Sequence, residues 1–439
     1  MKQQPLFGAG PESAKKTTAE EGVPRLRVAQ RQQLRLQVVD VDTLIPEDHA
    51  ARLIASAVER LDLSRFYERI RARGEAAGRP ATDPKLLVSL WLYATVDGIG
   101  SARELERLTR EHAAYRWLCG GVTVNHHLLA KFRVGYEQAL DDLLCDVISK
   151  LMAAGLITLR YVAHDGMRVR ASAGASSFRG RDRLTELSKE ARAHVGTLKK
   201  SVHDPGHRTR REAAQLRAAQ DRDERVKRAL DAMTDAEQTK ARQSRKKDRK
   251  KKPRVSTTDP EARVMKMADG GFRPAYNLQF STDVDSRFIV GVQVSTNGSD
   301  AALLTPAIED IERRVGLLPE AMLVDGGFVN RPAFDRAAAQ DIVIYAPVPT
   351  PRKPGIDPYE RKPGDSEANA AWRERMQTPE AKELYKQRAA TAETTNADLR
   401  THRGLDRLLV RGSGKVLSVT LWAALAYNLL HAPLSALAG

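Results

Sequence analysis

The sequence predicts an α/β protein in which a mixed sheet is flanked by helices, with an all-α N-terminal domain and a basic helical insertion. Three observations lead to this fold class. Apolar residues recur at helical spacing over residues 44–154. Blocks of β-branched and alternating apolar residues follow from residue 156 onward. A highly charged stretch at 179–254 separates the first of these blocks from the others.

The composition restricts the class of protein further. The chain has 439 residues, of which 72 are Lys or Arg and 56 are Asp or Glu, and its formal net charge is +16. This length predicts about two to four domains. With 41% hydrophobic and 29% charged residues, the chain is not a collagen, a membrane bundle or a wholly disordered protein. The positive balance favours a polyanionic partner, which is either a nucleic acid or an anionic membrane.

The N-terminal part of the chain divides into an arm and a helical domain. Residues 1–43 are polar with little periodicity and predict a mobile basic arm. Within 44–154, Asp83 followed by proline predicts a helix start, and the segment from Ser101 has the form of a capping box. A long single helix is expected to open at Thr123 or Asn125 and to continue through Leu151. Several short helices with tight turns resemble a helix-turn-helix DNA-binding domain, and a plain helical bundle is the alternative of equal weight.

The sheet is predicted from short apolar blocks. Residues 157–162 predict its first strand, within the segment 155–178, and residues 255–439 supply the rest of the same domain. Two antiparallel strands joined by a tight turn come next, and helices then alternate with strands. The elements expected after the insertion are strands at 275–282, 287–296, 321–324 and 342–346, helices at 301–315, 332–339 and 379–400, and a proline-rich loop at 347–365.

The inserted segment 179–254 predicts a helical hairpin that ends in a basic run from Arg245 to Lys252. It holds 25 basic and 12 acidic residues, the first 40 residues contribute a net +3, and the charges elsewhere cancel. The net charge of the chain therefore belongs to the arm and the insertion. A basic run of this kind is either a solvated linker or a segment that follows DNA phosphates.

Three carboxylates stand where α/β proteins place ligand-binding groups. Asp165 is expected just after the first strand, Asp325 ends the strand at 321–324, and Glu393 lies on the late helix. Carboxylates brought together repel one another unless a divalent cation neutralises them, and oxygen ligands suit Mg²⁺ or Mn²⁺. Two such ions can activate a water or a 3′-hydroxyl for phosphodiester displacement. Any one of these aspartates, taken alone, is more typical of a turn-capping residue.

The residues around these acids resemble bacterial insertion-sequence transposases, which are D-D-E recombinases. The segments YVAHDGMRVRASAGASSF (161–178), AMLVDGGFVN (321–330) and YKQRAATAETTNADLR (385–400) are similar to the three acidic motifs of that family. Residues 271–300 and 79–135 also resemble these proteins, so the resemblance covers most of the chain beyond the arm. It implies an RNase H-like catalytic domain.

The third motif resembles the family pattern Tyr-x2-Arg-x3-Glu-x6-Lys. Its four positions are taken by Tyr385, Arg388, Glu393 and Arg400. Four residues instead of three separate Arg388 from Glu393, and arginine replaces the final lysine. The extra residue moves Arg388 by one helical position, whereas Arg400 keeps a cation of different geometry.

The resemblance implies a role for each of these side chains. Asp165, Asp325 and Glu393 would be the catalytic acids and would bind Mg²⁺ or Mn²⁺, with two ions expected. The expected DNA-binding residues are Tyr385, Arg388, Arg400, Lys246, Lys247, Arg249, Lys250, Lys251 and Lys252. The partners would be double-stranded DNA, at transposon ends and target, and a second copy of the chain in a homodimeric synaptic complex. No membrane partner is expected, because no amphipathic anchor accompanies the charge.

The cysteines, His164 and the apolar C-terminal stretch are explained by packing rather than by catalysis or membrane insertion. Cys119 and Cys145 lie in apolar helical segments and predict buried thiols, which suits a reducing cytosol. On a strand, His164 should point away from the face of Asp165 and should pack rather than react. The apolar stretch 416–437 is interrupted by polar residues and predicts a helix buried in a core rather than a membrane span.

The sequence therefore predicts a DNA transposase that cleaves transposon ends in a metal-dependent reaction and transfers the 3′-hydroxyl to target DNA. A catalytically inactive, transposase-derived DNA-binding protein and an RNase H-like nuclease without strand transfer are the alternatives. The polar N-terminus lacks the apolar stretch of a secretory signal, so a cytoplasmic, nucleoid-associated location in a bacterium is expected.

Overall fold

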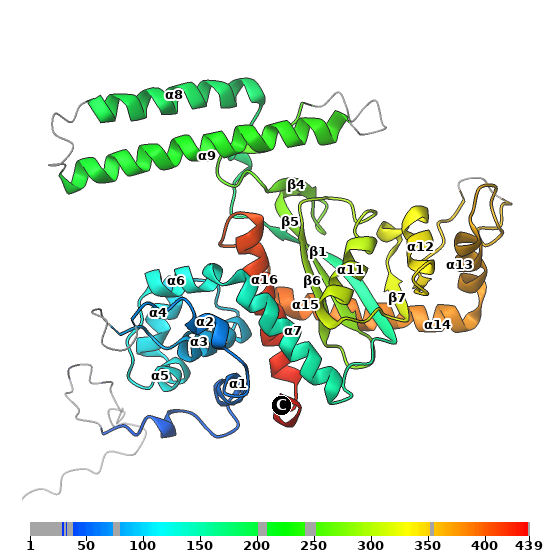
Figure 1. The fold of residues 1–439 in the computed structure, drawn as a ribbon, viewed down its shortest axis with the longest axis horizontal. Helices are drawn as coiled ribbons and strands as arrows, with labels where there is room; N and C mark the ends of the chain where they lie inside the picture. Colours follow the sequence, from blue (N-terminus) through cyan, green and yellow to red (C-terminus); the bar gives the residue numbers. More distant parts are fainter. Residues whose placement is uncertain are drawn as a thin grey trace, which may run out of the picture. The chain divides into compact units, whose positions relative to one another are not determined.

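The structure is a computed structural model that describes residues 29, 32, 38–72, 80–200, 209–241, 252–351 and 355–437. The predicted arm at 1–43 therefore lies almost wholly outside the described residues. The chain from Val41 to Gly439 is one compact unit that contains a set of N-terminal helices, a mixed sheet with helices around it, and a helical hairpin (Figure 1). The predicted α/β class is confirmed.

The N-terminal helices begin where capping side chains predict them. They are α1 (Ala50–Val58), α2 (Ser64–Tyr67), α3 (Pro84–Val96), α4 (Ala102–Glu111), α5 (Ala113–Cys119), α6 (His126–Gly135) and α7 (Glu137–Ala153). Asp83, Ser101 and Asn125 each accept a hydrogen bond from a backbone amide in the first turn of α3, α4 and α6. The single long helix predicted after Asn125 is wrong. The chain leaves helical geometry at Tyr136, whose ring stacks on Phe66 at 5.2 Å, and α7 begins there.

The C-terminal helix α16 (Ser413–His431) connects the N-terminal helices to the sheet. Nearly all of its residues between Val416 and Leu429 are buried, and it packs against α3, α7 and β6 (Figure 1). Trp422 donates a hydrogen bond to the carbonyl of Arg133 on α6 at 2.9 Å. The prediction of a helix buried in a core is confirmed. In the described part of the chain, no helix has both the length and the apolar character needed to cross a membrane.

The sheet has β1 near its centre. Its strands are β1 (Tyr161–Arg170), β4 (Arg263–Lys266), β5 (Phe272–Asp283), β6 (Ile289–Ser295), β7 (Ala321–Val324) and β8 (Val343–Tyr345). On one side of β1, β5 pairs antiparallel with it, and β4 and β6 pair antiparallel with β5. On the other side, β7 and β8 continue the sheet in parallel. The intervening helices α11 (Leu304–Val315) and α12 (Arg331–Ala338) supply the crossovers that parallel strands need. This mixed sheet is consistent with the RNase H-like fold.

The first strand differs from the prediction. Residues 157–160 lie outside β1, and Leu159 has a left-handed backbone with φ of 57°. An Asp-Gly pair predicts a turn, but β5 pairs with every residue of 162–170 and overrides that tendency. Asp165 therefore lies in the middle of β1, not after its end as the sequence predicts.

The later elements follow the prediction closely, with two additions. The helix predicted at 379–400 is α14 (Pro379–Arg388), a π-helical turn (Ala389–Glu393) and α15 (Thr394–Thr401) in succession. A further helix, α13 (Glu367–Gln377), precedes it and was not predicted.

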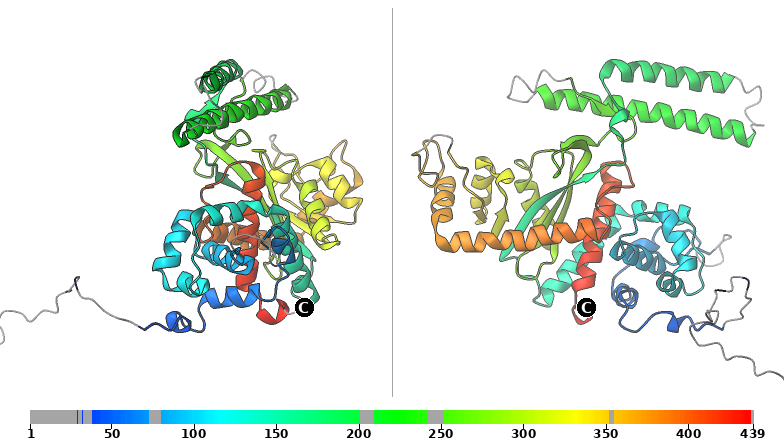
Figure 2. Two further views of the ribbon diagram at one scale, coloured as in Figure 1. Left: turned by 60° about the vertical axis from the view of Figure 1, so that its left-hand side comes forward. Right: turned by 180° about the vertical axis from the view of Figure 1, so that it is seen from behind.

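The inserted segment forms the predicted helical hairpin. Helices α8 (Arg181–Lys200) and α9 (Arg210–Ala241) run side by side in every view (Figures 1 and 2). Two short antiparallel strands, β2 (Phe178–Arg179) and β3 (Val255–Ser256), close the base of the hairpin. The insertion therefore begins and ends at one point of the fold.

Candidate active site

Asp165 is held at the centre of the sheet by polar contacts to both of its oxygens. Its Oδ1 accepts a hydrogen bond from the Gly166 amide at 2.9 Å, and its Oδ2 accepts one from Asn396 Nδ2 on α15 at 3.2 Å. Arg388 Nη1 lies 3.7 Å from Oδ2. Burial raises the pKa of Asp165 to about 6, Arg388 opposes this rise, and the charge of Asp325 adds to it.

Asp325 lies next to Asp165 because of strand register. His164 on β1 pairs with Val324 on β7, so the residues that follow them lie side by side at this edge. Asp325 Oδ1 accepts a hydrogen bond from the Gly327 amide at 2.8 Å and caps a short turn. Its charge also contributes to raising the pKa of Tyr385, for which burial is the larger cause. Two carboxylates therefore repel each other across the β1–β7 boundary.

Glu393 is brought to the same place by the π-helical turn. Arg388 Nη2 donates to Glu393 Oε1 at 2.8 Å, although the two residues are five positions apart. Residues on one face of an α-helix are three or four positions apart, and a π turn accommodates one extra residue. The π turn at Ala389–Glu393 therefore accommodates the extra residue between Arg388 and Glu393 that distinguishes this sequence from the family pattern.

Arg388 is the cation at the centre of this group. Its side chain is only 12% exposed and forms ion pairs with both Asp165 and Glu393, whereas the Glu393 side chain is 58% exposed. The guanidinium also lies over the Tyr385 ring, 6.0 Å from its centre. The structure thus brings together the acids and two of the expected DNA-binding residues.

Two polar atoms beside Asp165 lack a hydrogen-bond partner among the described residues. They are Asn396 Oδ1 and Arg388 Nη1, and both are buried. Unsatisfied buried polar atoms are rare, and their grouping is typical of a ligand site. No three His, Cys, Asp or Glu side chains in the described segments are close enough to hold a metal ion. Arg388 forms ion pairs with two of the three acids, Asp165 and Glu393.

Asp300 is a fourth acid that sequence reasoning missed. It lies in the loop before α11, and its Oδ1 accepts hydrogen bonds from Asn277 Nδ2 at 2.6 Å and Gln279 Nε2 at 3.1 Å. Its charge contributes to raising the pKa of Asp165. No spacing in the sequence points to a loop aspartate of this kind, because only the pairing of β1 with β5 brings it near the site.

Gly166 is the second residue whose role the sequence hides. A Cβ at this position would lie 2.8 Å from Asn277 Oδ1 and 3.0 Å from Asp300 Oδ1, and would overlap the Gln279 amide. The glycine therefore provides space for the Asp300 network, and not the backbone freedom of a turn.

His164 points to the opposite face from Asp165, as strand alternation predicts. It is buried, with hydrogen bonds to Ser281 at 2.8 Å and Gln279 at 2.9 Å. Burial lowers its pKa to about 4, so the imidazole is neutral at physiological pH. Its contacts are those of a packed core residue.

Of the remaining expected DNA-binding residues, the structure describes Arg400 and Lys252. Arg400 is exposed, and its Nη2 lies 3.5 Å from the carbonyl of Arg168. Lys252 is exposed next to β3. The others lie outside the described residues: Lys246, Lys247, Arg249, Lys250 and Lys251.

Comparison with known families identifies both ends of the unit. A model described as "Transposase domain (DUF772)" matches residues 39–134, and one described as "Transposase DDE domain" matches residues 359–431. The second match includes Glu393 but neither aspartate. No curated protein and no solved structure matches the chain significantly. The two family matches support a DNA transposase of the DDE type found in insertion sequences, as the motifs predict.

Proposed function

We propose that this transposase cleaves DNA at transposon ends and transfers the freed 3′-hydroxyl to target DNA, with Asp165, Asp325 and Glu393 as its catalytic acids. The observation that supports this proposal is the convergence of the three motifs on Arg388. Strand register brings the first two acids together, and the π turn brings the third to the same guanidinium. Such a group of acids requires a positive charge.

The donor set suits Mg²⁺ or Mn²⁺, because carboxylates and amide oxygens are hard ligands. Asp165, Asp325 and Glu393 would hold two such ions, and the unpartnered Asn396 Oδ1 is a further oxygen beside them. The ions, when bound, supply activation of a water or 3′-hydroxyl and stabilisation of the leaving oxygen.

Arg388 has a second role in this proposal. With Asp165 and Glu393 serving as metal ligands, its guanidinium would be free of both ion pairs and would be available to bind a DNA phosphate in bidentate fashion. Tyr385 and Arg400 lie on the same helical segment and would contact the same strand. Double-stranded DNA is thus the partner, bound by a homodimer that pairs the two transposon ends in a bacterial cytoplasm.

Conservative amide variants test the assignment. Asp165→Asn, Asp325→Asn and Glu393→Gln should each abolish Mg²⁺-dependent cleavage of DNA that carries a transposon end, while end binding stays largely intact. The matched control is Asp341→Asn, an exposed turn residue with φ of 59°, where asparagine is well tolerated. Full Mg²⁺-dependent nicking by Asp325→Asn would contradict the proposal.

The same assay separates the alternatives. Cleavage by the unmodified protein without joining of 3′ ends to target DNA would identify a nuclease. End binding without any cleavage in Mg²⁺ or Mn²⁺ would identify a DNA-binding protein that has lost activity.

A further inference from the structure

A cavity of about 570 Å³ lies between α4, α6 and the segment that leads into α16. It is lined by four cationic side chains and two histidines, together with apolar and small residues. These six are Arg103, His126, His127, Arg133, Arg411 and Lys415. No Asp or Glu is among the described residues that line it. The cavity therefore concentrates positive charge, and Glu106, which contacts His126, is not itself part of the lining.

Arg133 is buried in this cavity, with only 9% of the residue exposed. Its Nη1 donates to the carbonyl of Gly100, and its guanidinium lies 4.7 Å from the centre of the Trp91 ring. Its Nε finds no hydrogen-bond acceptor in the described chain, and no carboxylate there forms an ion pair with it. Burial lowers the pKa of Arg133 to about 10, as expected for a cation removed from water without an anion. Buried charges normally have a counter-charge, so this one indicates an external anion.

The other polar groups at the cavity are accounted for. Glu106 Oε2 lies 2.6 Å from His126 Nδ1 and accepts a hydrogen bond from the His126 amide at 3.1 Å. Arg411 Nε donates to the carbonyl of Ser172 at 3.2 Å, and neither Arg411 nor Lys415 forms an ion pair among the described residues. Helix α4, of ten residues, begins at the cavity and adds the positive end of its dipole, whereas the first amide of α6 already donates to Glu106.

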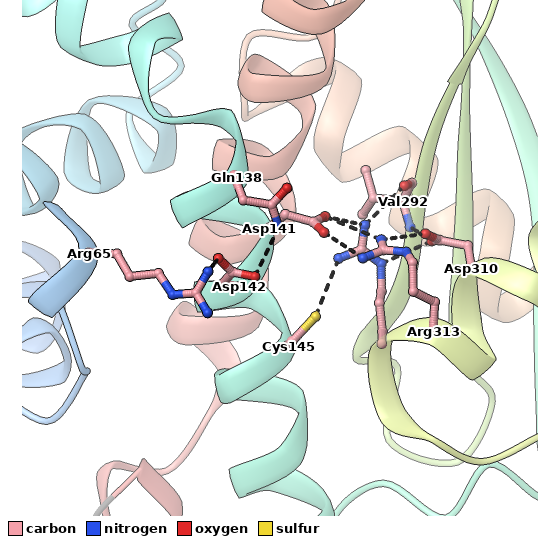
Figure 3. Close-up of polar contacts among 9 residues, drawn as sticks. Arg65, Gln138, Asp141, Asp142, Cys145, Val292, Asp310 and Arg313 are labelled. Carbon is pink, nitrogen blue, oxygen red and sulfur yellow. Dashed lines mark hydrogen bonds and ion pairs between the residues drawn. The ribbon is translucent and has the colours of Figure 1, made fainter.

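A second cavity, lined in part by the start of α16, has cations that are neutralised within the protein. It has about 700 Å³, and its wall between α7, α11 and β6 carries cations and acids together. Arg313 lies 2.7 Å from Asp141 and 2.8 Å from Asp310, and buried Arg314 pairs with the same two acids (Figure 3). This cluster holds α7 against α11 and needs no external anion.

We propose that the basic cavity binds a backbone phosphate of the transposon DNA and thereby holds the duplex on the helical domain and the catalytic domain at once. The inference rests on the proposed function, because its ligand is DNA. Arg103, His126 and Arg133 belong to the segment matched as one transposase domain, and Arg411 and Lys415 belong to the other. The cavity is also tied to the active-site strand, because the amide of Leu408 donates to the carbonyl of Arg170 at 2.8 Å. The segment that lines the cavity is therefore hydrogen-bonded to the strand that carries Asp165.

The test measures binding of a short random-sequence DNA duplex by fluorescence anisotropy over a range of salt concentrations. The buffer contains EDTA, so the result does not depend on cleavage. The main variant is Arg411→Ala/Lys415→Ala, which changes two exposed side chains. The matched control is Arg116→Ala/Arg336→Ala, which removes the same charge from exposed positions on α5 and α12. Thermal melting confirms that both variants are folded.

The main variant should bind DNA about tenfold or more weakly than the control, and its salt slope should fall by about one to two. Arg133→Lys, which keeps the charge, should retain more affinity than Arg133→Met. Inorganic phosphate should compete with DNA more effectively on the unmodified protein than on the main variant. Equal affinities and equal salt slopes for the main variant and the control would overturn the proposal. So would saturation by inorganic phosphate without any loss of DNA affinity, because the cavity would then be a small-anion site.

The two proposals fail separately. If cleavage does not require Asp325 but the salt slope of the main variant falls, the phosphate-binding role of the cavity is supported and the catalytic assignment is contradicted. If the salt slope of the main variant is unchanged while Asp325→Asn is inactive, the catalytic assignment is supported and the phosphate-binding role of the cavity is contradicted.

Discussion

The candidate active site around Asp165, Asp325 and Glu393, here called the acidic site, differs from the basic cavity in how its buried charge is neutralised. At the acidic site, Arg388 pairs with Asp165 and Glu393, so the protein supplies its own counter-charge. At the cavity, Arg133 is buried without a carboxylate in the described chain. A ligand at the first site must replace an internal ion pair, whereas a ligand at the second completes an unpaired charge. Ligand binding at the acidic site would therefore exchange one counter-charge for another, whereas ligand binding at the basic cavity would supply the counter-charge that Arg133 lacks.

The largest expected effect comes from changing the length of the π turn. Insertion of one alanine after exposed Ala390 turns Glu393 by about 100° away from Arg388 and should abolish cleavage. Deletion of Ala390 converts the turn to an α-helix of the family spacing and should keep cleavage within a few-fold. Both variants should keep the salt-dependent binding that the basic cavity supplies, because neither change touches the cavity, and any loss of DNA affinity then measures the contacts of Arg388 and Arg400. Cleavage that tolerates the insertion would show that the pairing of Arg388 with Glu393 is irrelevant to the site.

Deletion of the inserted hairpin should weaken DNA binding more than it harms the fold. The sequence attributes most of the net charge to this insertion, and within it residues 242–254 hold nine basic residues and one acidic residue. Arg179 pairs with Val255, so removing 181–253 leaves Gly180 and Arg254 as a two-residue hairpin loop. We expect roughly 10- to 100-fold weaker binding and a smaller salt slope.

The same loss should follow from replacing the basic run alone. A variant with glutamine at Lys246, Lys247, Arg249, Lys250, Lys251 and Lys252 keeps both helices of the hairpin. Salt titrations of both variants and the unmodified protein check this, and an unchanged slope would show that the charge of the insertion does not serve DNA. Combination with Arg411→Ala/Lys415→Ala should give additive effects if the two surfaces bind separate phosphates.

Replacement of Asp165 should reveal its pH-dependent effect on stability. Because burial raises its pKa to about 6, folding favours the neutral carboxyl. This contribution is complete below the unfolded pKa of about 3.9 and is lost as the pH rises through about 6. Asp165→Asn stays neutral and should be more stable than the unmodified protein by roughly 2 kcal/mol at about pH 8, with no advantage at about pH 4.

Urea unfolding in EDTA measures this difference, with exposed Asp341→Asn as the matched control. Added Mg²⁺ should narrow the difference, because a bound divalent cation stabilises the ionised carboxylate. A stability difference that does not vary with pH would contradict the environment described for Asp165.

The smallest effect is expected at Gly166. Gly166→Ala forces apart the Asn277, Gln279 and Asp300 side chains and should destabilise the fold by about 1–3 kcal/mol. Gly196→Ala is the control, because a Cβ there meets nothing within 4 Å and alanine favours the helix α8. Urea midpoints that move equally for the two variants would show that the space at Gly166 is not restricted.

The sequence predicted the features that depend on local signals. Helix caps at Asp83 and Ser101, the strand at 321–324 and its terminal Asp325 are all found where the residues indicate. The length of β1 was not predictable, because an Asp-Gly pair favours a turn until a long partner strand pairs with it. The π turn could not be predicted either, because one extra residue in a helix leaves no recognisable change in the spacing of apolar residues.

Features that depend on distant contacts could not be read from the sequence. Asp300 reaches the site from a loop, through hydrogen bonds to two residues of β5. The basic cavity combines residues that are about 300 positions apart, and only the packing of α16 against the N-terminal helices brings them together.

The central claim is that Asp165, Asp325 and Glu393 hold the metal. Iron-mediated cleavage of the polypeptide tests it most directly: Fe²⁺ replaces Mg²⁺, peroxide and ascorbate generate radicals at the ion, and the fragments are mapped. The account predicts cuts close to residues 165, 325 and 393 that compete with Mg²⁺ and disappear together in Asp325→Asn but persist in Asp341→Asn. Cuts at other positions, or cuts unaffected by Asp325→Asn, would contradict it.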